Sequence, residues 1–112
     1  TLFMYCEDVD YCMRLGDAGV PLWFLPDARI WHKAGGSAGG MLSVYYITRN
    51  TLYLTCKGKS RAYARRKTVV PLLTGAARYG LTKLLGRRKG RSYGAFRGAL
   101  DFWRGRMGRM QS

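Results

Sequence analysis

The stretch from Tyr5 to Gly40 constrains the fold most, because its residues fix the type and order of several short elements. It contains five of the six acidic residues of the chain and its only histidine. Acidic residues open a helix predicted over 7–18, where they suit the positive end of the helix dipole. Short apolar runs predict strands over 22–25 and 28–31, and a glycine-rich loop follows over 33–40.

The remainder of the chain predicts three further helices, over 41–56, 62–85 and 92–110, the second of them interrupted by Pro71. In the first of these, the residues recurring at helical spacing are Val44, Ile47, Thr51 and Leu54. In the second, the apolar face consists of Val69, Leu73, Ala76, Gly80 and Leu84. The predicted fold class is an α/β fragment, with a helix, two short strands and a glycine loop, followed by a mainly α-helical basic tail.

Charge is divided unevenly along the chain, whose net charge is +14. Residues 1–34 have a net charge of −2, whereas residues 35–112 carry seventeen basic residues against a single acid, Asp101. A segment this basic favours a polyanionic partner, such as a nucleic acid, an anionic membrane surface or a phosphorylated substrate. No apolar run reaches the roughly 18 to 20 residues needed to cross a bilayer.

Length and cysteine content narrow the class of protein. The 112 residues are enough for one small domain. The chain opens at Thr1 in the middle of an apolar pattern, so we expect it to be a piece of a longer protein. Its three cysteines lack a Cys-x-x-Cys spacing, which argues against a disulfide framework and a zinc site and is ordinary for reduced thiols facing the cytosol.

Each chemical feature of the first forty residues has an ordinary structural explanation when it is taken alone. Acids in the first turn stabilise a helix without any catalytic role. A histidine at the end of a strand, such as His32, is more often a hydrogen-bonded structural residue than a ligand. Together, however, the acids, the histidine and the glycine loop favour a site that takes a proton, holds a metal and approaches a phosphate.

The same order of residues resembles the C-terminal half of the catalytic domain of family 2 glycosyltransferases, which have the GT-A fold, and in particular the rhamnosyltransferase-like branch. The resemblance covers residues 1–55, half of the chain. The matching runs are Tyr5-Cys6-Glu7-Asp8-Val9-Asp10-Tyr11-Cys12-Met13-Arg14-Leu15, Ala18-Gly19, Phe24-Leu25-Pro26-Asp27-Ala28, Trp31-His32-Lys33, Gly36-Ser37 and Tyr45-Tyr46-Ile47-Thr48-Arg49-Asn50. It implies that residues 1–56 are the acceptor-side part of a catalytic domain and that residues 57–112 are a basic amphipathic helical tail.

The resemblance implies an inverting transfer of a sugar from a nucleotide-sugar donor to an acceptor hydroxyl, in bacterial polysaccharide or cell-wall glycan synthesis. Asp8 would be the general base that takes the proton of the hydroxyl, and Glu7 and Asp10 would orient it or contact the acceptor. A divalent cation, Mg²⁺ or Mn²⁺, would neutralise the leaving diphosphate, with His32 as one ligand and the others outside this chain. Because the donor-binding half is missing, we expect the chain alone to be inactive.

The glycine loop is the expected contact with the donor phosphates. Gly35 and Gly36 have no side chains, so backbone N–H groups can approach anionic oxygens there, and Lys33 and Ser37 lie beside them in the sequence. A passive linker to the next helix is an equally good interpretation. For Arg49 and Asn50, which recur in the family, the alternatives are a structural role and a phosphate-facing one.

The basic tail predicts binding at a membrane surface. Amphipathic helices with basic borders and interleaved aromatic residues suit an anionic leaflet, where each basic residue contributes on the order of 1 kcal/mol. This places the protein in the cytoplasm, peripheral at the inner face of the cell membrane, beside a glycan or lipid-linked acceptor. Alternatively, the apolar faces pack on the missing half of the domain. A second class of function is a basic nucleic-acid- or membrane-surface-binding module without catalysis.

Overall fold

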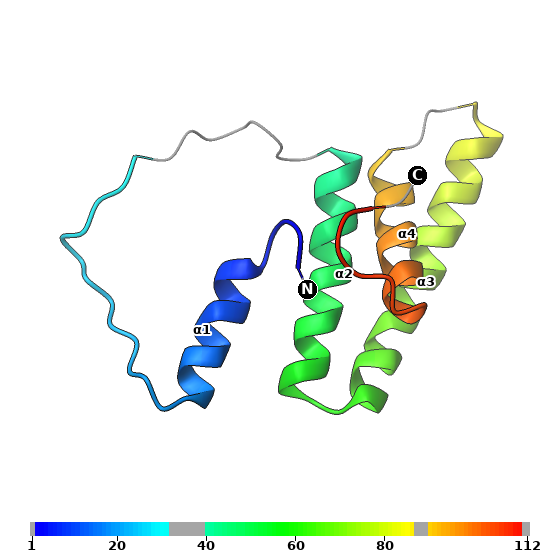
Figure 1. The fold of residues 1–112 in the computed structure, drawn as a ribbon. Coiled ribbons are helices and arrows are strands. Elements are labelled where there is room, and N and C mark those ends of the chain that lie inside the picture. Colours follow the sequence, from blue (N-terminus) through cyan, green and yellow to red (C-terminus); the bar gives the residue numbers. More distant parts are fainter. Residues whose placement is uncertain (1, 32–39, 87–89, 111–112) are drawn as a thin grey trace.

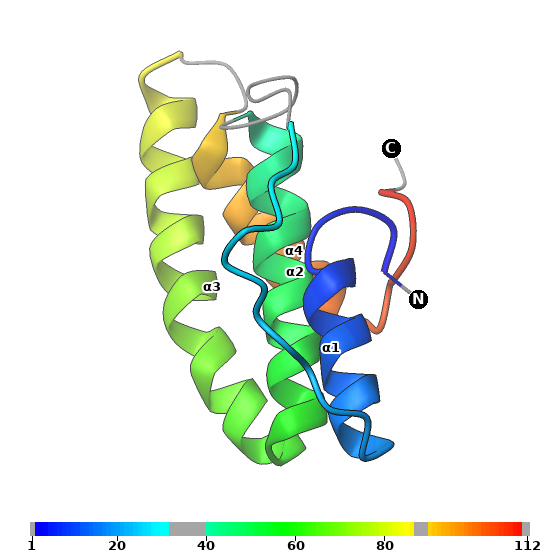
Figure 2. The ribbon, with the colours of Figure 1, turned by 90° about the vertical axis from the view of Figure 1, so that its left-hand side faces the viewer.

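The structure is a computed structural model that describes residues 2–31, 40–86 and 90–110. These residues form four helices: α1 (Glu7–Asp17), α2 (Met41–Gly58), α3 (Arg61–Leu84) and α4 (Arg91–Trp103). Helices α2, α3 and α4 pack together as a small bundle, and α1 and α3 lie on either side of α2 (Figures 1 and 2). After α1, the chain runs outside the bundle in a wide arc (Figure 1).

The predicted α/β fold class is wrong, because the regular structure of the described residues is entirely α-helical. The segments 22–25 and 28–31 have extended or turn backbone and pair with no other described segment. Their apolar side chains are largely exposed, including those of Trp23, Phe24 and Trp31. A short extended segment forms a stable strand only against partner strands with a shared apolar face, and the described residues supply none.

The helix predictions are confirmed for α1, α2 and α3 and corrected at two points. Helix α3 continues through Pro71 without interruption, although proline removes one hydrogen bond of the helical ladder. Helix α4 ends at Trp103 rather than at residue 110. Gly105 has a φ of 67°, and the chain turns back there toward α2, where the backbone N–H of Met110 donates to the hydroxyl of Tyr46 at 2.9 Å.

The two long helices bury mostly residues outside the predicted rows, although Leu54 of the predicted row in α2 is buried. In α3, the predicted face is the exposed one: Leu73 and Leu84 face away from the bundle, and Ala64, Thr68 and Gly75 face into it. In α2, Ile47 is exposed, and the buried residues are Ser43, Tyr45, Tyr46, Arg49, Asn50, Leu52 and Leu54. Among the described helices, none is long and apolar enough to cross a bilayer.

Two glycines set how closely α4 packs against α2. A Cβ atom on Gly94 would overlap the carbonyl oxygen of Met41, and one on Gly98 would overlap the carbonyl oxygen of Tyr45. The two backbones therefore touch directly at these points.

Alanine substitutions test this packing in both directions. Gly94→Ala and Gly98→Ala should each lower the free energy of unfolding by about 1–3 kcal/mol, because the added methyl group forces the helices apart. Gly80→Ala should raise it by about 0.5–1 kcal/mol, since nothing lies within 4 Å of that position and alanine favours the helix. Urea unfolding followed by circular dichroism measures both effects. A change of the same sign in the free energy of unfolding of all three variants would contradict the packing described.

Candidate functional site

The acidic start of α1 follows two residues with an unusual backbone. Tyr5 and Cys6 have φ angles of 64° and 66°, in the left-handed region that side chains other than glycine rarely occupy. Such a conformation costs about 1–3 kcal/mol per residue and persists only where the surrounding structure imposes it. The turn at Tyr5 and Cys6 therefore has a fixed backbone shape, which sets the direction in which α1 begins.

A buried side chain of α2 imposes that shape. The side-chain amide of Asn50 donates to the carbonyl oxygen of Met4 at 2.7 Å and to that of Tyr5 at 2.9 Å. Asn50 is itself fully buried, and the Nε of Arg49 donates to its side-chain oxygen at 3.2 Å. The turn before the acidic residues is thus held by α2 and not by α1, which buries none of its own residues.

The three acidic residues of the first turn differ in their surroundings. Glu7 and Asp8 are exposed, and neither forms an ion pair within the described part of the chain. Asp10 lies against α2, where its carboxylate accepts a hydrogen bond from Lys57 and pairs with Arg14 at 3.4 Å. The hydrogen bond from Lys57 holds the pKa of Asp10 below its usual range. Asp8 is therefore available to a substrate, and Asp10 is already engaged.

Arg49 is completely buried, which rules out a phosphate-facing role for its guanidinium in this arrangement. Its Nη1 atom donates to the hydroxyl of Tyr45 at 3.1 Å, and its Nη2 atom donates to the carbonyl oxygen of Gly108 at 2.8 Å. The guanidinium also lies 5.2 Å from the ring centres of Tyr45 and Tyr46. These contacts assign Arg49 the structural role, in which it joins α2 to the C-terminal segment.

The network continues from α2 into α4. The hydroxyl of Tyr45 donates to Oδ2 of Asp101 at 2.9 Å, and the Nε of Arg97 donates to the same oxygen at 3.1 Å. Burial, together with the hydrogen bond to Asp101, raises the pKa of Tyr45 to about 12. The one acid of the basic segment, Asp101, is thus a buried partner for Tyr45 and Arg97, and it contributes almost nothing to the surface.

Several predicted site residues lie outside the described residues: His32, Lys33, Gly35, Gly36 and Ser37. Their proposed roles at the metal and the donor phosphates stay predictions. In the part of the chain that the structure describes, no group of three or more histidine, cysteine, aspartate or glutamate residues could hold a metal ion.

A cavity of about 330 Å³ lies between α2, α3 and the end of α4, away from the acidic turn. Aromatic side chains line it, among them Tyr53, Phe102 and Trp103, and the guanidinium of Arg65 lies over the ring of Trp103 at 5.6 Å. No acidic residue lines the cavity, so it offers no carboxylate as a general base.

Sequence reasoning found the acidic residues but did not find the buried hydrogen-bond network that joins α2 to α4 and to the C-terminal segment. Tyr45, Arg49 and Asp101 were not predicted to interact, because their contacts join segments more than fifty residues apart. A signal was present, since Asp101 is the only acid among so many basic residues and Arg49 follows Tyr45 by one helical turn.

Comparisons with protein-family models, with curated proteins and with solved structures gave no match.

The raised pKa of Tyr45 predicts how stability depends on alkaline pH. Unfolded tyrosine loses its proton near pH 10, whereas folded Tyr45 keeps its proton until about pH 12. The folded state therefore binds more protons in this interval, and the stabilisation present below pH 10 is lost as the pH rises to 12. Urea unfolding between pH 8 and pH 12 should show this loss.

Two variants isolate the contribution of Tyr45 to the loss of stability at alkaline pH. Tyr45→Phe should be less stable at pH 8 by about 1–3 kcal/mol, because it leaves buried polar groups without a partner, and its stability should fall less steeply above pH 10. Tyr11→Phe alters an exposed tyrosine and should match the unmodified protein at every pH. An equally steep decline in Tyr45→Phe would show that another group causes the alkaline loss.

Proposed function

We propose that this chain is the acceptor-side part of an inverting sugar transferase of the family 2 type, in which Asp8 is the general base. The sequence resemblance supplies the reaction class. The observation that carries the proposal is the strained turn at Tyr5 and Cys6, which Asn50 holds and which places Asp8 at the exposed start of α1. Backbone strain of this kind is typical of functional sites, because ordinary helix starts do not need it.

In the proposed reaction, the carboxylate of Asp8 accepts the proton of an acceptor hydroxyl as its oxygen bonds to the anomeric carbon of the donor sugar. The bond from that carbon to the nucleoside diphosphate breaks at the same time, which inverts the configuration. Glu7, exposed beside Asp8, contacts the acceptor. Asp10 positions the first turn of α1, because its ion pair with Lys57 joins that turn to α2.

The proposal assigns donor binding to a segment beyond this chain and to the predicted loop residues after Trp31. The described acids do not fit a metal site, because Asp10 is paired with Lys57 and Arg14 and the remaining carboxylates do not converge with other ligands. The cation expected at the donor diphosphate would therefore be held by residues other than these acids. The described residues present two exposed carboxylates, those of Glu7 and Asp8, directly after a rigid turn.

The test is sugar transfer by the protein produced together with its donor-binding segment. Release of nucleoside diphosphate is measured with a panel of UDP-, dTDP- and GDP-sugars, with a bacterial lipid extract as the source of acceptor. Asp8→Asn should lower kcat by about 100-fold or more, because the base is lost and the shape is kept. Asp10→Asn should have a smaller effect, since its carboxylate serves to position the turn.

Asp17→Asn is the matched control, because Asp17 is an exposed acid at the far end of the same helix. Its kcat should equal that of the unmodified protein. Circular dichroism spectra of all three variants should be the same. Near-normal turnover by Asp8→Asn would exclude Asp8 as the base, and the absence of transfer from every sugar nucleotide would exclude the proposed function.

A further inference from the structure

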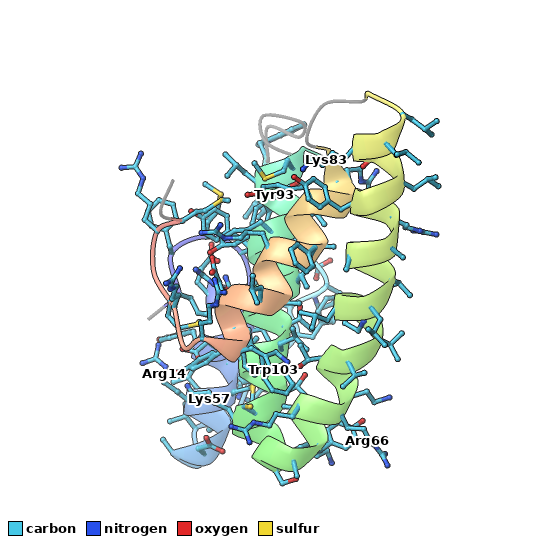
Figure 3. The ribbon with its side chains drawn as sticks, turned by 90° about the vertical axis from the view of Figure 1, so that its right-hand side faces the viewer. Arg14, Lys57, Arg66, Lys83, Tyr93 and Trp103 are labelled. Carbon is cyan, nitrogen blue, oxygen red and sulfur yellow. The ribbon has the colours of Figure 1, made fainter. Side chains whose placement is uncertain are left out.

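Helix α3 carries a continuous apolar stripe on the side that faces away from the bundle. The stripe consists of residues spaced three or four apart, with a single arginine near its start: Tyr63, Arg66, Val70, Leu73, Ala77, Leu81 and Leu84. All of these side chains are exposed, and Leu84 is 85% exposed. Figure 3 shows side chains projecting from α3 on the side away from α4, with Arg66 near the N-terminal end. We call this surface the outer stripe of α3.

Basic side chains border the outer stripe and no acid offsets them. Helix α3 contains arginines and lysines in its first and last thirds, including Lys67, Arg78 and Lys83, and it contains neither aspartate nor glutamate. The nearest acids in the sequence are Asp27 and Asp101, and Asp101 is buried in the network with Tyr45. The surface around the stripe is therefore apolar at its centre and positively charged at its edges.

We propose that the outer stripe of α3 docks the protein on an anionic lipid bilayer, with the helix lying in the plane of the interface. A helix with an exposed apolar face and basic borders buries that face at the boundary between headgroups and acyl chains. Long basic side chains extend sideways to reach the headgroup phosphates. The charges complement an acidic leaflet. A nucleic-acid partner would not bury the five large apolar side chains of the stripe, and contact with water does not stabilise them.

A second exposed apolar segment, residues 20–25, lacks the basic borders of the outer stripe and serves as a comparison. Residues 20–25 expose Leu22 and Leu25 to almost the same degree as Leu73 and Leu81 in α3. The segment lies between Asp17 and Asp27 in the sequence, and no lysine or arginine stands between these two acids. The segment itself carries no basic residue, so charge complementarity favours the outer stripe over this segment.

The outer stripe and the acidic turn are separate features of the molecule. They belong to α3 and α1, which lie on either side of α2 (Figures 1 and 2). A bilayer against the stripe therefore lies on the opposite side of α2 from α1. Docking does not depend on the proposed sugar transfer, and either proposal can fail without the other.

Co-sedimentation with vesicles tests the apolar part of the proposal. The full chain should bind vesicles of phosphatidylcholine that contain phosphatidylglycerol, and should bind phosphatidylcholine alone much more weakly. Leu73→Ser/Leu81→Ser should weaken binding to the anionic vesicles by roughly tenfold or more, because two inserted side chains are lost. The matched control is Leu22→Ser/Leu25→Ser. It removes two leucines of similar exposure, 56% and 67% against 63% and 57%, and should bind as the unmodified protein does.

A second pair of variants tests the electrostatic part. Arg66→Gln/Arg78→Gln should weaken binding to anionic vesicles by roughly tenfold or more and should reduce its dependence on salt concentration. Arg106→Gln/Arg109→Gln removes the same charge from the C-terminal segment near α2 and should have a much smaller effect. All four positions are exposed, so circular dichroism should show an unchanged fold.

Each contrary result overturns the proposal in a different way. No binding to anionic vesicles excludes a lipid partner. Binding that is lost in Leu22→Ser/Leu25→Ser but kept in Leu73→Ser/Leu81→Ser moves the contact to the other segment. Salt-sensitive binding to random-sequence duplex DNA without vesicle binding identifies a nucleic acid as the partner. A dimer in analytical ultracentrifugation that the α3 double variant abolishes, again without vesicle binding, makes the stripe an interface between copies.

Discussion

The structure depends on a pair of adjacent buried polar residues in the middle of α2. Removing a guanidinium from water is costly unless hydrogen bonds and charge compensate, and Arg49 obtains both from two tyrosine rings, backbone carbonyls and the indirect charge of Asp101. Its guanidinium donates to Tyr45 within α2 and to carbonyl oxygens of the C-terminal segment, and Tyr45 in turn donates to Asp101 of α4. Asn50 reaches the turn before α1. One turn of helix therefore joins four parts of the chain that share little apolar core.

This arrangement explains how two chemically different surfaces are held on one small bundle. The acidic turn is fixed from α2, so α1 can remain exposed and present to solvent Asp8, whose carboxylate accepts a hydrogen bond from the backbone N–H of Val9. Helix α3 packs on the other helices through the small residues Ala64, Thr68 and Gly75 and through the ring of Tyr79. The large apolar side chains of α3 are consequently on the outside, where the basic residues border them. The function we propose uses the first surface, and membrane docking uses the second.

The sequence predicted those features that are local and missed those that depend on distant partners. Helical spacing located α1, α2 and α3, because a helix satisfies its backbone within one segment. The runs at 22–25 and 28–31 were mistaken for strands, since β-propensity is realised only against a pairing partner. Amphipathic spacing found the apolar row of α3 but could not tell whether it faces the core. The acids were identified as candidates, while the burial of Arg49 required the fold of residues 104–110.

The central claim is that buried Asn50 holds the acidic turn in place, and amide hydrogen exchange in the Asn50→Ala variant tests it most directly. Exchange in α1 should accelerate by tenfold or more, as for a helix released from its anchor, while α2 and α4 stay protected. Thr55→Ala is the control, because the hydroxyl of Thr55 bonds only within its own helix. Unchanged exchange in α1 of Asn50→Ala would show that the turn keeps its shape without this anchor, and would contradict the account.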